Sequence, residues 1–92
     1  MGNMDMSAPN ASMMMSMQKM NAGMTAAMAL KDPDLAFLCG MIPHHQGAID
    51  MARDVLKTGK DAEAKAMATA VITAQTTEIA AMMAMIERLG KM

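Results

Sequence analysis

Methionine and histidine side chains carry the chemistry that stands out in this 92-residue chain, which contains 17 Met and two adjacent histidines, His44 and His45. Thioether sulfur is a soft, neutral ligand that selects Cu(I), or the chemically similar Ag(I), over Zn, Mg or Ca, and imidazole also suits copper. Thioethers lose no proton on binding, so such a site works at moderately low pH and under oxidising conditions that consume thiolates. These residue types indicate a protein that binds a soft metal ion.

Other chemistries lack the residues that they need. The chain has three Glu and no Glu-x-x-His pair, which a di-iron bundle requires, and it has neither a His-Glu-x-x-His motif nor a glycine-rich phosphate loop. A formal charge of -1, with no basic run and one aromatic residue, argues against a nucleic-acid partner. No apolar stretch approaches the roughly 18 to 20 residues that span a bilayer. We therefore expect no catalytic turnover, no nucleic acid and no membrane insertion.

Packing is the competing explanation for the methionines. A single Met at helical spacing is more often core filler than ligand, and a Met-rich face can also grip an apolar protein partner. The set as a whole favours metal, because packing alone would also use Leu and Phe, and the chain has only five Leu and one Phe. Two alternatives stay open: a Met-rich helical adaptor that binds an apolar partner, and a cuprous oxidase that acts on Cu(I) itself.

Three helices must position these side chains. Val, Ile and aromatic residues, which favour strands, are scarce, whereas Ala, Met and other helix formers dominate. We predict helices over residues 12–30, 34–57 and 61–89, with Asp32 and Asp61 as caps and Pro33 at a first helical position. We interpret residues 1–11 as a flexible Met-rich leader and residues 12–92 as one all-α domain, an antiparallel bundle of three helices.

The spacing of the apolar residues predicts which side chains share a level of the bundle. The second helix presents two adjoining apolar rows, which place both histidines in the buried arc and Pro43 on the solvent side. Facing residues across a tight antiparallel hairpin have numbers that add to a constant. This rule predicts two levels, one with Met20, Met24, Met41, His44 and His45, and one with Met13, Met51 and Met67. His44 should face Gln75 and Met41 should face Glu78, and we expect both polar residues to orient imidazoles rather than bind metal.

The stretch from Asp34 to Ala52 resembles the signature of the CopM-like family, a domain of unknown function that forms small exported bacterial helical bundles of ferritin-like fold. Its core is Met41-x-x-His44-His45-x-x-Ala48-x-x-Met51. The later stretch from Ala74 to Met82 is similar to the second block of that family. The resemblance covers about residues 32–89, and the Met-rich first helix lies outside its specific part.

The resemblance implies a periplasmic or secreted protein that binds Cu(I) and Ag(I) and contributes to copper and silver tolerance. It would sequester the ion or, as a metallochaperone, hand it to a copper-transport protein. The implied ligands are Met41, His44, His45 and Met51, with Met82 as a further candidate. Composition and periodicity add the remaining candidates: Met13, Met17, Met20, Met24, Met28, Met67 and Met85.

Two expectations concern the ends and the partners of the chain. Export would require a signal peptide that is absent from the sequence shown. Three helices leave one side of the inner, Met-rich surface uncovered. A homodimer that completes a four-helix-type bundle is therefore a further expectation.

Overall fold

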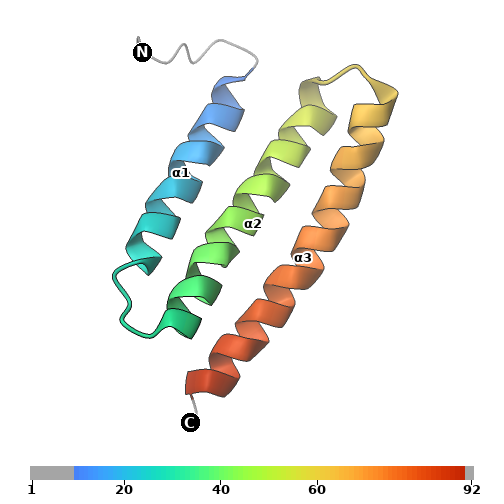
Figure 1. Cartoon of the computed structure of the whole chain (residues 1–92). Coiled ribbons are helices and arrows are strands. Elements are labelled where there is room, and N and C mark those ends of the chain that lie inside the picture. The colour runs from blue at the N-terminus through green and yellow to red at the C-terminus, as the bar shows by residue number, and fades with distance from the viewer. Residues whose placement is uncertain (1–9, 91–92) are drawn as a thin grey trace.

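The structure, a computed structural model, describes residues 10–90 and consists there of three helices: α1 (Ala11–Ala27), α2 (Pro33–Thr58) and α3 (Ala62–Gly90) (Figure 1). No strand occurs among these residues, so the predicted all-α fold is confirmed. Consecutive helices run antiparallel, as their short connections require. The predicted leader over residues 1–11 falls outside the described residues except for its last two, and Ala11 already belongs to α1.

The starts of α2 and α3 follow from capping side chains. Asp32 caps α2, because its Oδ1 accepts the Asp34 N–H at 2.9 Å, and Pro33 fills a first-turn position that needs no N–H donor. Asp61 does the same for α3, with its Oδ2 2.8 Å from the Ala64 backbone nitrogen. Both predicted caps are confirmed.

The end of α1 comes earlier than predicted. The helix ends at Ala27 rather than near Leu30, because the chain tightens there into hydrogen bonds that span three residues instead of four. The Leu30 N–H, for example, donates to the Ala27 carbonyl oxygen at 3.1 Å. Asp32 then turns to an extended conformation before Pro33, which disfavours a helical residue ahead of it.

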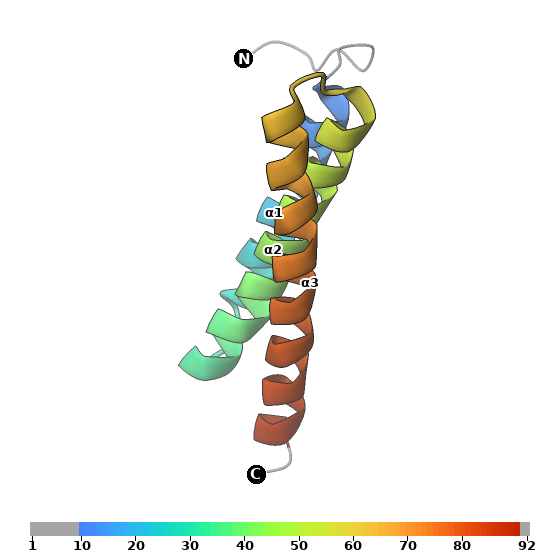
Figure 2. The same ribbon diagram turned by 90° about the vertical axis from the view of Figure 1, so that its right-hand side faces the viewer.

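The three helices lie side by side in one open layer with α2 in the middle (Figure 1). Both α1 and α3 pack along α2, and among the described residues no Cα atom of α1 lies within 8 Å of one of α3. Figure 2 shows the layer edge-on, with α3 in front. The molecule measures 48 × 32 × 12 Å, and its radius of gyration of 15.3 Å exceeds the value of about 12 Å for a compact chain of this length. No helix of residues 10–90 therefore covers either face of the layer.

Small residues let α1 approach α2 closely. A Cβ added at Gly23 would lie 2.7 Å from Pro43 Cβ, and one added at Gly47 would lie 2.8 Å from the sulfur of Met20. The expectation that Pro43 faces solvent is therefore wrong, and the residue is half-buried in the α1–α2 seam. The reason is that α2 has a neighbour on each flank, so the side opposite its α3 contact is occupied by α1.

The α2–α3 seam contributes most of the large buried side chains. Its buried members recur at helical spacing on the two helices: Leu38, His45, Ile49 and Ala52 on α2, and Ala68 and Met82 on α3. No side chain among residues 10–90 falls below 2% exposure. The core is thin, because a single layer of helices has contacts between its members but no enclosed interior.

The expectation that no apolar stretch is long enough to span a bilayer is wrong for α3. Within Ala62–Gly90 an 18-residue window reaches a mean hydropathy of 1.3, and 6% of that window is buried. By length and composition alone, this helix qualifies as a membrane span. Threonines interrupt the apolar residues, so the sequence contains no long uninterrupted apolar run. The side chains of Thr69, Thr73 and Thr77 donate to carbonyl oxygens one turn earlier in the same helix.

Candidate metal centre

One face of the layer carries the apolar row of α2 that lies between the helix's contacts with α1 and its contacts with α3. The helical repeat aligns this row: Phe37, Met41, His44, Ala48, Met51 and Val55. The sequence predicts the row to face inward, but it borders the surface because α1 and α3 occupy the two flanks of α2. The open face is our name for this row together with the residues that border it: Met13 and Met24 of α1, Met28 directly after α1, and Met67, Val71, Glu78, Met82 and Met85 of α3.

Three methionines, one from each helix, line a single hollow of the open face, which we call the three-helix hollow. They are Met13 of α1, Met51 of α2 and Met67 of α3. The predicted common level of these residues is therefore confirmed. All other lining residues are Ala or Val, so the three thioether sulfurs are the side-chain heteroatoms of this hollow.

Two further hollows meet at Phe37 and Met41. The hollow between α1 and α2 adds Met24 and Met28, as well as the polar neighbours Asn21 and Thr25. The hollow between α2 and α3 adds His45, Glu78, Met82 and Met85. Met41 borders both hollows, and it lies ten residues before Met51 on the same helix, or roughly 15 Å along the axis. One ion therefore cannot bind Met41 and Met51 together.

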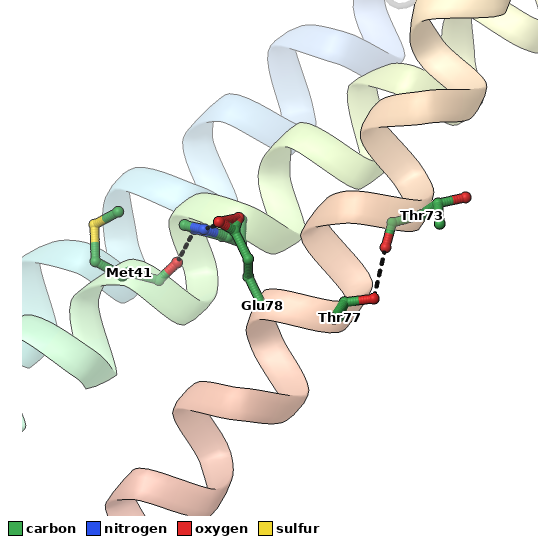
Figure 3. Close-up of polar contacts among 5 residues, drawn as sticks. Met41, Thr73, Thr77 and Glu78 are labelled. Atoms are coloured by element: carbon green, nitrogen blue, oxygen red, sulfur yellow. Dashed lines mark hydrogen bonds and ion pairs between the residues drawn. The ribbon is translucent and has the colours of Figure 1, made fainter.

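His45 is the buried histidine, and both of its ring nitrogens have partners. Nδ1 lies 2.9 Å from the Met41 carbonyl oxygen, and Nε2 lies 2.9 Å from Oε2 of Glu78 (Figure 3). Because a carbonyl oxygen only accepts, Nδ1 carries a proton, and Nε2 is the nitrogen that a metal ion would use. Coordination by His45 therefore requires that the side chain of Glu78, which is 56% exposed, turns away from Nε2.

The contact between His45 and Glu78 also shows how the α2–α3 register differs from the prediction. Glu78 was expected level with Met41, and it meets the residue one helical turn further along α2. The expected hydrogen bond between Glu78 and an imidazole is present. Gln75, expected opposite His44, is half-buried, and its Oε1 has no hydrogen-bond partner among the described residues.

The two histidines do not converge on one point. Their ring centroids are 5.8 Å apart, with planes tilted by 58°. His44 is exposed and lines none of the three hollows, whereas His45 reaches the α2–α3 seam. Adjacent residues lie about 100° apart around a helix, and a central helix with two neighbours offers no single wide buried arc. The prediction that both histidines belong to one site is therefore wrong.

Two predicted ligands on α1 also lie away from the hollows of the open face. Met20 covers Gly47 and lines a groove on the opposite face, beside Lys19 and Asp50. Met17 is 45% exposed and lines none of the three hollows. The spacing places five methionines on one side of the predicted first helix, but the close approach of α1 to α2 separates Met20 from the others that line the hollows: Met13, Met24 and Met28.

Histidine, cysteine and carboxylate side chains do not gather into a metal site in the described part of the chain. Among residues 10–90, no group of three or more His, Cys, Asp or Glu side chains could hold a metal ion. Cys39 is a free, half-buried thiol that lines none of the three hollows. Zinc, calcium and magnesium sites are built from such donors. The donors that do come together are thioethers, with His45 at their edge.

Phe37 borders both hollows around Met41, although the sequence predicts it only as a core residue. It also lines a hollow between the start of α2 and the end of α3, and it is 61% exposed. Its position one helical turn before Met41 is the sequence signal that links it to the methionines. The aromatic ring therefore contributes apolar surface at the point where the thioether hollows meet.

Comparison with known proteins identifies one relative and a family. An uncharacterized protein of Acanthamoeba polyphaga mimivirus is 44% identical over 46 residues, which are 50% of this chain and 30% of that protein. The match thus spans less than a third of the relative's length. The family described as "Domain of unknown function (DUF305)" matches residues 1–86, which is nearly the whole chain, so this protein belongs to that family.

Proposed function

We propose that this protein binds Cu(I), and its analogue Ag(I), through thioethers of the open face, and that it sequesters the ion or hands it to a copper-transport protein. The observation that carries the proposal is the three-helix hollow, where Met13, Met51 and Met67 from three different helices line one apolar recess. Packing does not require sulfur at these positions, since Leu and Met exchange in protein cores at little cost.

The donor set of the three-helix hollow favours a soft monovalent ion. A hard divalent ion would have to exchange its water shell for three neutral sulfurs, which it binds weakly. The other residues that line the hollow are Ala and Val, which offer the ion no side-chain ligand. Cu(I) and Ag(I) prefer thioethers, and their single charge is less costly to move away from water. The same donors would reject Zn, Mg and Ca.

The hollows around Met41 offer a second set of soft donors. Met24 and Met28 border Met41 on one side, and Met82 and Met85 border it on the other. His45 lies at this edge, but the contact between its Nε2 and Oε2 of Glu78 occupies the position that a metal ion would take. Thioethers are therefore the primary ligands of this proposal, and imidazole ligation by His45 is conditional on movement of Glu78.

The proposed location follows from the same chemistry. Thioether sites need no thiolate, so they suit an oxidising compartment, and we place the protein in the periplasm or outside the cell. A contribution to copper and silver tolerance is the corresponding physiological role. Deletion of the gene should then lower the copper concentration at which growth stops, and restoration of the intact chain should reverse this effect.

The proposal is tested by an anaerobic titration of Cu(I), and separately Ag(I), against a competing chromophoric chelator. The test variant is Met13→Leu/Met51→Leu/Met67→Leu, because leucine keeps the apolar volume and removes the three sulfurs. The wild-type protein should withdraw at least one ion per chain from the chelator. The variant should bind more than about tenfold more weakly, which corresponds to about 1.4 kcal/mol.

The matched control is Met14→Leu/Met15→Leu/Met83→Leu, which removes three sulfurs from exposed methionines that line none of the three hollows. It should bind Cu(I) as the wild type does. Equal losses in the two variants would show that surface methionines bind the ion without a defined site. A wild-type protein that cannot compete with the chelator would refute the metal function itself.

A further inference from the structure

We infer that the open face is the contact surface for a second copy of this chain, so that two single layers stack into a two-layer helical assembly. The inference does not depend on metal binding, because it rests on the burial and polarity of the open face.

The single chain lacks the interior that a folded domain needs. Of the seven buried hydrophobic residues between positions 10 and 90, four are alanines, and the three larger ones are Leu38, Ile49 and Met82. Large apolar side chains are instead exposed on the open face, with Met28 63%, Phe37 61% and Met67 66% exposed. Helical domains reach stability by packing one layer against another. A second layer over the open face would supply the missing interior.

The two faces of the layer differ in polarity, which identifies the face that is covered. The three hollows of the open face are lined by one charged residue, Glu78, and it is paired with His45. The groove on the opposite face contains Lys19 and Asp50 with other polar side chains. The helical repeat places Arg53 and Lys57 on that same side of α2, away from Met51. The opposite face is thus suited to water and the open face to an apolar partner.

The dimensions of the layer suit a second copy of the chain. The face measures 48 × 32 Å, a projected area of roughly 1,500 Å², whereas a standard interface needs roughly 800 Å² from each partner. A twofold axis through the face would bring the same apolar surface from both chains together, and such self-complementary contacts are the commonest in oligomers. With a formal charge of -1, each chain contributes little net repulsion.

The experiment measures the mass of the full, metal-free chain in solution by sedimentation over a wide range of protein concentration. We expect a species of two chains, each of 9.8 kDa, that dissociates on dilution. The test variant is Met67→Glu on the open face, and the matched control is Met83→Glu, because these exposed methionines of α3 have similar exposures of 66% and 58%. They lie about 160° apart around the helix.

Met67→Glu should weaken the association more than about tenfold, since it places a charge in the apolar contact, whereas Met83→Glu should leave it unchanged. Far-UV circular dichroism verifies that both variants are helical, and Phe37→Glu provides a second test on α2. A wild-type chain that stays a monomer at every concentration would overturn the inference. So would a Met67→Glu variant that still forms the dimer.

The outcome is separable from that of the metal proposal. The variant Met13→Leu/Met51→Leu/Met67→Leu keeps the apolar surface, so it should remain a dimer even where it loses Cu(I). A metal-binding monomer would refute this inference alone, and a dimer without metal affinity would refute only the metal proposal. A monomer that floats with neutral phospholipid vesicles would assign the open face to a membrane surface instead.

Discussion

Replacement of Gly23 by Ala should destabilise the protein, whereas the same replacement at Gly40 should stabilise it. Both glycines lie inside helices, where exchange of Gly for Ala ordinarily adds about 1 kcal/mol of stability. At Gly23 the new Cβ would lie 2.7 Å from Cβ and 3.1 Å from Cγ of Pro43. The proline ring is part of the α2 backbone and cannot rotate away, so α1 and α2 would have to separate.

The expected magnitudes follow from these distances. Overpacking typically costs about 1 to 3 kcal/mol, so after the gain in helix propensity Gly23→Ala should lose up to about 2 kcal/mol. At Gly40 the nearest atom to the new Cβ is the terminal carbon of Met28 at 3.4 Å, an ordinary contact with a flexible side chain. Gly40→Ala should therefore keep most of its gain of about 1 kcal/mol. The free energies of unfolding of the two variants should differ by about 1 to 3 kcal/mol.

Urea unfolding followed by far-UV circular dichroism measures both variants, because the chain has no Trp or Tyr to report by fluorescence. All samples need the same protein concentration, since association would shift the midpoint. A Pro43→Gly background removes the ring and its Cβ, so there Gly23→Ala should behave like Gly40→Ala. Equal shifts of the two variants in the original background would refute the close approach of α1 and α2 at Pro43.

Three further predictions use the same unfolding measurement. Asp32→Ala should lose about 1 kcal/mol because α2 loses its cap, whereas Asp32→Asn should retain most of the stability, and an unchanged midpoint for Asp32→Ala would contradict the capping contact at 2.9 Å. Ile49→Ala should lose roughly 2 to 4 kcal/mol because Ile49 is only 3% exposed, and a loss near zero would mean that the α2–α3 seam collapses around the cavity. Ag(I) at a hundredfold excess over its dissociation constant from the wild type should raise the stability of the wild type by about 2.7 kcal/mol but that of the Met13→Leu/Met51→Leu/Met67→Leu variant by less than about 1.4 kcal/mol, and an equal rise in both would contradict the three-helix hollow as the site.

Local rules account for the parts of the fold that the sequence predicts well. Caps and turns act within a few residues, so Asp32 and Asp61 mark the starts of their helices correctly. Met13, Met51 and Met67 keep their predicted common level because the hollow that they line extends over about two turns of α2 and of α3, so a register error of one turn leaves them together. Further along the same helices, the error reaches a full turn at Glu78, which meets His45 instead of lying level with Met41.

The amino-acid sequence by itself determined the three helices, their caps and the supply of thioether donors, because helical period and capping depend on neighbours along the chain. Only the tertiary structure decided that His45 reaches Glu78 while His44 stays exposed, and that Pro43 packs on Gly23. The physical reason is the central position of α2. A helix with neighbours on two opposite flanks buries two narrow stripes instead of one wide arc, and the row between those stripes, with Met41 and Met51, becomes a surface.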